Sequence, residues 1–147
     1  MQPWQEKPTH ADASRPQRLP KPYRLKRQHL IRPLFDRTTE GVGTVAVGCV
    51  RLVYRVVSRK EVGVDVPVQI GFAVGRAARK AVVRNRIKRI LREVYRVHQH
   101  VLVDLFLCSE SCLTLMVLYR SDPSSASSCV KRDLPEAMRK LAARVSK

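Results

Sequence analysis

The chain has 147 residues, with 29 Lys and Arg against 12 Asp and Glu, so its formal net charge is +17 and its pI about 10.7. This length suits a single domain with a real core. The charge favours a nucleic-acid partner, and less strongly an anionic membrane surface. No apolar run approaches the ~20 residues that span a bilayer, and the N-terminus lacks the apolar core of a secretory signal. We therefore expect a cytoplasmic protein without a membrane partner.

The first 22 residues are set apart by their composition. Residues 1–22 contain five of the nine prolines and few apolar side chains, which predicts a disordered, proline-rich basic tail. Residues 23–147 are expected to form one folded domain. It begins with a helix over residues 25–37, whose apolar side chains share a face, although Pro33 should shorten or kink it.

The middle of the chain is rich in valine and punctuated by glycine. Residues 42–57 predict either one long bent strand or two short strands. A polar loop over residues 58–67 follows, and then a strand over residues 68–75.

The second half alternates between helical and strand patterns. A helix is expected at about residues 79–98, and residues 99–111 either prolong it or form an insertion. A continuous apolar run predicts a strand over residues 113–119. A loop over residues 122–128 and a closing helix over residues 130–145 complete an α+β chain.

The most informative segment is the basic helix. Nine Lys or Arg and a single acid, Glu93, lie between residues 76 and 96. Helical spacing gathers one apolar stripe, made of Val83, Ile87, Ile90, Leu91 and Val94. The opposite face then carries Asn85, Lys88, Arg89, Arg92 and Arg96, with Arg84 and Arg86 on its flanks. This helix therefore folds against a core and presents a cationic outer face to a polyanion.

The four cysteines (Cys49, Cys108, Cys112 and Cys129) are expected to be reduced thiols. Cys108 and Cys112 lie near His98 and His100, which leaves zinc binding as an alternative. Their spacing matches no common pair of zinc ligands. We therefore expect no metal ion bound by the protein alone.

The residues around the basic helix resemble a known family, the bacterial ribonuclease P protein subunit. The resemblance is carried by residues 71–96, GFAVGRAARKAVVRNRIKRILREVYR, with its Arg-Asn-Arg core. Residues 24–27, Leu34 and Phe35 look like the family's first helix, and residues 113–120 look like its last strand. The resemblance covers residues 23–145.

The resemblance implies a two-layer α-β sandwich with a four-stranded sheet, in the order α-β-β-β-α-β-α. Helices are expected on one side of the sheet, which contains an unusual left-handed β-α-β crossover. It also implies an accessory subunit of an endoribonuclease. A catalytic RNA with bound Mg²⁺ removes the 5′ leader of precursor tRNA, and the protein contributes no catalytic residue. No further protein partner is implied.

The resemblance also assigns roles to residues of this chain. The basic helix and the turn before it are expected to contact the catalytic RNA through Arg76, Arg79, Lys80, Arg84, Asn85, Arg86, Lys88, Arg89, Arg92 and Arg96. Arginine forks suit phosphate groups because they bind them in a bidentate fashion. The single-stranded leader is expected in a cleft between the sheet and the first helix, where stacking side chains are needed. The aromatic candidates are Phe35, Tyr54 and Phe72, each of which could instead be an ordinary core residue.

Three departures from the family pattern bear on leader binding. Ile31 stands where an aromatic side chain is usual, one turn before Phe35. Ala77 removes one cation of the usual basic turn, for which Arg79 or Lys80 would have to compensate. An acidic residue that commonly opens the last strand is absent at Cys112.

Two other functions fit parts of the sequence. A structural RNA-binding protein would share the charge and the basic helix but would not need a leader cleft. A nonspecific DNA-compacting protein would fit the charge but not the compact α-β pattern. The acids are scattered and form no pair suited to a protein-borne nuclease site.

Overall fold

The structure, a computed structural model, describes residues 19–36 and 38–146, so most of the predicted tail lies outside it. Its elements are η2 (Lys21–Tyr23), α2 (Gln28–Phe35), β1 (Val42–Val47), β2 (Val50–Ser58), α3 (Arg59–Val62), β3 (Val68–Val74), α4 (Ala81–His98), α5 (His100–Phe106), β4 (Ser111–Tyr119), η3 (Pro123–Ser125) and α6 (Ala126–Val145). Among these described residues, no helix has both the length and the apolar character needed to cross a membrane.

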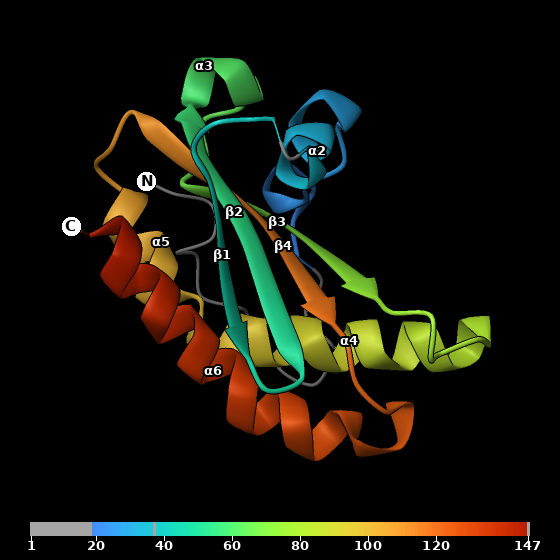
Figure 1. The fold of residues 1–147 in the computed structure, drawn as a ribbon. Coiled ribbons are helices and arrows are strands. Elements are labelled where there is room, and N and C mark those ends of the chain that lie inside the picture. Colours follow the sequence, from blue (N-terminus) through green and yellow to red (C-terminus); the bar gives the residue numbers. More distant parts are fainter. Residues whose placement is uncertain (1–18, 37, 147) are drawn as a thin grey trace, which may run out of the picture.

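The four strands form one sheet in the order β1-β2-β4-β3 (Figure 1). β1, β2 and β4 are antiparallel neighbours, whereas β3 runs parallel to β4. Parallel neighbours need a crossover connection, and here it consists of α4 and α5. The predicted α+β order is confirmed. The valine-rich segment forms two strands, β1 and β2, and the chain reverses direction between them at Gly48, which has a φ of +53°.

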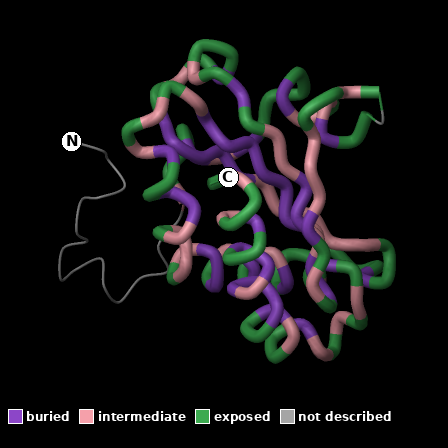
Figure 2. Tube along the Cα trace, turned by 60° about the vertical axis from the view of Figure 1, so that its left-hand side comes forward, coloured by how far each residue is buried: buried purple, intermediate pink, exposed green. Residues whose placement is uncertain are grey.

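Apolar clusters lie on both faces of the sheet. The larger cluster joins one face to α4, α5 and α6, and includes Leu52, Leu115 and Leu134. The smaller cluster joins the opposite face to η2, α2 and α3, and includes Leu30 and Met116. The sheet and the inward sides of the helices are the buried part of the trace in Figure 2. Helices therefore lie on both sides of the sheet rather than on one side. The longer helices, α4 and α6, lie together on one side.

The first helix begins later than predicted. It starts at Gln28 rather than at residue 25, because the chain before it is extended and pairs with the edge strand β3. Arg24 forms a parallel bridge with Ile70, and the backbone N–H of Leu25 donates to the carbonyl of Ile70 at 2.9 Å. An edge strand offers unpaired backbone groups, and here this short segment satisfies some of them.

Two predicted loops contain helical structure. α3 forms within residues 58–67 because the Ser58 hydroxyl accepts the Lys60 N–H, and Gly63 ends the turn in the left-handed region. The final helix begins at Ala126 rather than at residue 130, after a turn in which the Asp122 side chain accepts the Ser124 N–H. The ambiguous stretch after the basic helix forms a separate short helix, α5.

Candidate nucleic-acid interface

Helix α4 carries the predicted apolar stripe on the side that faces the sheet. Ile87 and Leu91 are fully buried, Val94 is nearly so, and Val83 and Ile90 are partly buried against the same cluster. The stripe is confirmed, and the helix is held by the core along most of its length. Its basic side chains therefore project from a fixed scaffold.

The ten residues predicted to bind RNA all lie on α4 or in the turn between β3 and α4. Seven of them are exposed: Arg76, Arg79, Lys80, Arg84, Asn85, Arg86 and Arg89. Three are partly buried: Lys88, Arg92 and Arg96. The first six of the exposed group surround the start of α4, and we call them the arginine patch.

Two arginines of this patch are tethered to neighbouring backbone. Arg84 Nη1 donates to the carbonyls of Ala78 and Arg79, at 3.4 Å and 3.2 Å. Arg86 Nη2 donates to the carbonyl of Pro123 at 3.3 Å, across the loop that precedes α6. A guanidinium has five N–H donors, so each contact orients the fork and leaves further donors for a phosphate.

The turn before α4 is anchored by a small buried residue. Ala78 is 2% exposed, and its N–H donates to the carbonyl of Gly75 at 3.2 Å. The exposed cations Arg76, Arg79 and Lys80 flank this anchor. The turn therefore presents cations on a braced backbone rather than on a loose loop.

A groove lies between α4 and the extended segment that pairs with β3. Its volume is about 390 Å³. It is lined by Leu19, Arg24, Leu25, Lys26, Ile70, Gly71, Phe72, Lys88 and Arg92. We call it the β3-edge groove. It brings together two cations of α4 and two of the N-terminal segment, which lie more than 60 positions away in the sequence.

One aromatic ring lines this groove. Phe72 packs edge-on against Tyr95 of α4, with the ring centroids 6.1 Å apart and an interplanar angle of 70°. On the groove's other wall, Arg24 Nε donates to the carbonyl of Leu19 at 2.7 Å. Four cations and one aromatic ring around a narrow depression match what single-stranded nucleic acid requires of a protein surface.

Sequence reasoning did not include Arg24 and Lys26 among the site residues. The sequence signal was present, because apolar and basic residues alternate from Tyr23 to Lys26. In the structure Tyr23 and Leu25 are buried, Arg24 is partly exposed and Lys26 is exposed. Alternation with a period of two indicates extended backbone. The helix predicted from residue 25 would not place these two cations on one wall.

Arg96 differs from the other cations of α4. Its guanidinium forms a two-point ion pair with Glu93, with Nη2–Oε1 at 2.6 Å and Nε–Oε2 at 3.3 Å. The hydrogen bond from Arg96 lowers the pKa of the Glu93 carboxyl, which therefore stays ionised at neutral pH. Arg96 is thus partly neutralised within the protein.

The basic surface does not suit Mg²⁺. This ion prefers carboxylate, phosphate and water oxygens, whereas the only acid between residues 76 and 96 is Glu93, already paired with Arg96. Among the described residues, the histidine and cysteine alternative for zinc is not assembled either, because His98, His100, Cys108 and Cys112 do not bring three ligand atoms together. All four cysteines are free thiols.

The three aromatics predicted to bind the leader do not share one surface. Phe35 is 52% exposed at the end of α2, the helix that packs on the smaller cluster. Tyr54 and Phe72 pack against the larger cluster on the opposite face of the sheet. Ile31, which replaces a usual aromatic, packs on the smaller cluster. Leader binding by each aromatic stays a prediction, but one cleft holding all three is inconsistent with this geometry.

Comparison with known proteins gives concordant results. The family model for ribonuclease P matches residues 19–146. The ribonuclease P protein components of Dictyoglomus thermophilum and Desulfovibrio desulfuricans are similar, with 61% identity over 31 residues and 62% over 32 residues. These matches cover 21% and 22% of this chain, and the chain spans about a quarter of each of these curated relatives (26% and 25%).

The fold is also similar to solved structures. One structure of the RNase P protein of Staphylococcus aureus matches with a TM-score of 0.57 and 21% identity, covering 81% of this chain and 94% of that one. A second structure of the same protein gives a TM-score of 0.56 at 20% identity, covering 86% and 93%. The family match over residues 19–146 and the shared fold lead to one conclusion: this chain belongs to the ribonuclease P protein family.

Proposed function

We propose that this protein is the accessory subunit of a ribonuclease P ribonucleoprotein. It binds the catalytic RNA and the 5′ leader of precursor tRNA, and it assists removal of the leader. The observation that carries the proposal is the division of α4 into two adjoining basic surfaces. The helix begins in the arginine patch and continues along the β3-edge groove.

The arginine patch suits a structured RNA. Arg84 and Arg86 are exposed, and each is oriented by a contact to backbone on either side of the helix start. Oriented guanidinium groups bind phosphates in a bidentate fashion with less loss of side-chain freedom than a mobile lysine. Asn85 lies exposed between them and offers an amide to a ribose 2′-OH or a phosphate. We assign this patch to the catalytic RNA.

The β3-edge groove suits the single-stranded leader. A backbone of phosphates can follow Lys26, Lys88 and Arg92, while Phe72 offers an aromatic ring in the lining. We therefore place the leader along this groove rather than at one cleft shared by the three predicted aromatics.

The chemistry is assigned to the RNA. The basic surface has no acid that is free to hold Mg²⁺, so the ions that activate water are expected to be bound by the RNA. The protein's contribution is electrostatic: its cations offset repulsion between the phosphates of the two RNAs. This effect is largest when Mg²⁺ is scarce.

The test is cleavage of a 5′-extended precursor tRNA by a bacterial ribonuclease P RNA at low Mg²⁺, with and without this protein. We expect stimulation by the wild type and its loss in Arg84→Ala/Arg86→Ala. The matched control is Lys131→Ala/Lys140→Ala, which removes the same charge from exposed positions of α6. Full stimulation by the control would exclude a simple effect of net charge.

Two other results would reject the proposal. Tight RNA binding by the wild type without any stimulation would favour a structural RNA-binding protein. Equal affinity for duplex DNA and for the catalytic RNA would favour nonspecific DNA binding.

A further inference from the structure

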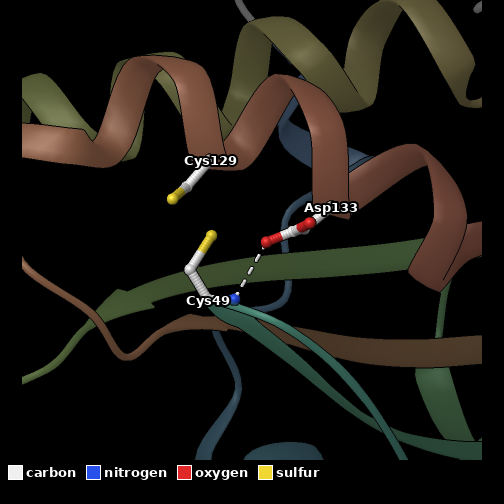
Figure 3. Close-up of side chains that lie close together, drawn as sticks. All are labelled: Cys49, Cys129 and Asp133. Atoms are coloured by element: carbon white, nitrogen blue, oxygen red, sulfur yellow. Dashed lines mark hydrogen bonds between the residues drawn. The ribbon is translucent and has the colours of Figure 1, made fainter.

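Three potential metal ligands meet where the turn between β1 and β2 contacts α6. They are the thiols of Cys49 and Cys129 and the carboxylate of Asp133 (Figure 3). One ligand atom from each lies within 4.8 Å of the others. Cys129 and Asp133 are four residues apart and therefore lie on one face of α6, whereas Cys49 approaches from the turn.

The carboxylate is held in a fixed orientation. Asp133 Oδ2 accepts the backbone N–H of Cys49 at 3.0 Å, and Oδ1 accepts Arg132 Nε at 2.9 Å. The hydrogen bond from Arg132 is the main cause that lowers the pKa of Asp133 to about 2, so the group is ionised. Arg132 Nη2 also donates to Oδ2 at 3.4 Å. Because each carboxylate oxygen has two acceptor sites, one site remains on Oδ1. Hydrogen bonds of this kind orient metal-binding carboxylates in proteins.

The backbone of the turn allows this close approach. Gly48 has a φ of +53°, and a side chain at this position would collide with the Asp133 carboxylate. Cys49 and Asp133 are buried, whereas Cys129 is partly exposed. The cluster is therefore sheltered on the side of the sheet. On the side of Cys129 it is bordered by the exposed side chain of Arg132, whose Nη2 donates to Cys129 Sγ at 3.7 Å and to Asp133 Oδ2 at 3.4 Å. A metal ion would enter there by displacing this guanidinium, and a water molecule would take the fourth position.

We propose that Cys49, Cys129 and Asp133 form a binding site for a thiophilic divalent cation, represented by Zn²⁺. Two sulfur ligands and one carboxylate favour zinc over Mg²⁺ or Ca²⁺. Zinc holds sulfur at about 2.3 Å and oxygen at about 2.0–2.2 Å, so its ligands lie about 4 Å or less from one another. Small rotations of these side chains reach that arrangement, whereas a disulfide needs the two sulfurs about 2 Å apart.

Binding replaces protons with the metal ion. Burial raises the pKa of the Cys49 thiol to about 12, so this thiol is protonated when no metal is bound. Each thiol releases its proton to solvent as its sulfur–metal bond forms. The site joins the β1–β2 turn to α6, uses none of the residues assigned to RNA, and does not depend on the proposed function. It runs against the sequence-based expectation that the protein alone binds no metal.

The experiment is titration of the full chain with Co²⁺, a coloured substitute for Zn²⁺, in the presence of a non-thiol reductant. We expect thiolate-to-cobalt absorption that saturates at one equivalent and disappears when Zn²⁺ is added. Cys49→Ser and Cys129→Ser should each abolish this absorption. Cys108→Ser, which changes an exposed thiol outside the cluster, should leave it unchanged. Asp133→Asn keeps an acceptor for the Cys49 N–H and should weaken binding.

Circular dichroism of each serine variant separates a lost ligand from a lost fold. A folded Cys49→Ser or Cys129→Ser protein that retains the full absorption would overturn the proposal. So would a wild-type protein that shows no absorption at saturating Co²⁺. A mass two hydrogens lower, in a protein that binds no Co²⁺, would show that the two thiols form a disulfide instead.

Discussion

Helices α4 and α6 both carry many cations, but they use them differently. The segment from Arg76 to Arg96 has nine Lys or Arg and one acid, whereas α6 has five cations and two acids. In α6, Arg139 pairs with Glu136 at 2.7 Å and Arg132 pairs with Asp133 at 2.9 Å. A third cation of α6, Arg144, donates to the carbonyl of Thr44 at 2.6 Å.

Most cations of α4 form no ion pair with an acid of the described residues and can bind an external partner. Apart from the ion pair of Arg96, the contacts of Arg84 and Arg86 are to backbone carbonyls, which carry no net charge. Backbone contacts orient an arginine without cancelling its charge. The comparison teaches that a count of cations does not measure the charge that a helix leaves for a partner. Acids of the same protein pair with one of the nine cations of residues 76–96, but with two of the five cations of α6.

The variant expected to have the largest effect on RNA affinity is Arg84→Ala/Arg86→Ala. We expect affinity for the catalytic RNA to fall about 100-fold, because each charged contact contributes about 1.5 kcal/mol or more and 1.4 kcal/mol is a factor of ten. Filter binding or fluorescence anisotropy measures the affinity. The fold should be intact, since both side chains are exposed.

The α6 pair Lys131→Ala/Lys140→Ala is the matched control and should change that affinity less than about threefold. Salt dependence adds a second readout. If about six cations touch phosphates, the slope of log affinity against log salt is roughly −4 to −5. It should become shallower by roughly 1.5 in the α4 variant only. Equal effects of the two pairs would break the comparison.

The second test concerns the groove wall of α4. Lys88→Ala/Arg92→Ala should lower affinity for precursor tRNA about tenfold in the assembled ribonucleoprotein, with little change for mature tRNA, because only the precursor has a leader. Competition between the two tRNAs measures this difference. If the variant weakens both tRNAs equally, the groove does not bind the leader.

Most of the fold could be predicted from the sequence, because its signals are local. The apolar stripe of α4 and the valine-rich strands follow helical and strand periodicity, and both are confirmed. The predicted start of α2 was wrong because a tertiary contact decides where the helix begins. The backbone N–H of Leu25 donates to the carbonyl of Ile70, 45 positions away in the sequence. Periodicity within residues 25–37 contains no information about that edge strand.

The candidate site was predictable only in part, for the same reason. The cations of α4 follow from spacing along one helix. The β3-edge groove needs Arg24 and Lys26 to lie beside Lys88 and Arg92, which depends on how the chain folds back. That Phe35 and Tyr54 lie on opposite sides of the sheet could not be predicted from the sequence, because it depends on which face of the sheet α2 packs against. Tyr54 lies two residues from Leu52 and shares its buried face.

A smaller effect separates the two sides of the sheet. Phe35→Ala should reduce the preference for precursor over mature tRNA about twofold to fivefold if this exposed ring stacks on the leader beyond the groove. Binding of the catalytic RNA and thermal stability should hardly change. A clear loss of stability would instead show that Phe35 packs within the fold and would remove it from the leader path.

The smallest effect is expected where α4 resembles α6. Glu93→Gln removes the partner of Arg96 and should raise affinity for the catalytic RNA about twofold. Because the folded-state pKa of Glu93 is lowered, its carboxylate is charged at neutral pH and the ion pair weakens only when the pH falls through that lowered value. Glu136→Gln releases Arg139 in the same way on α6 and should leave RNA affinity unchanged. If both substitutions raise affinity equally, then RNA responds to net charge rather than to the unneutralised cations of α4.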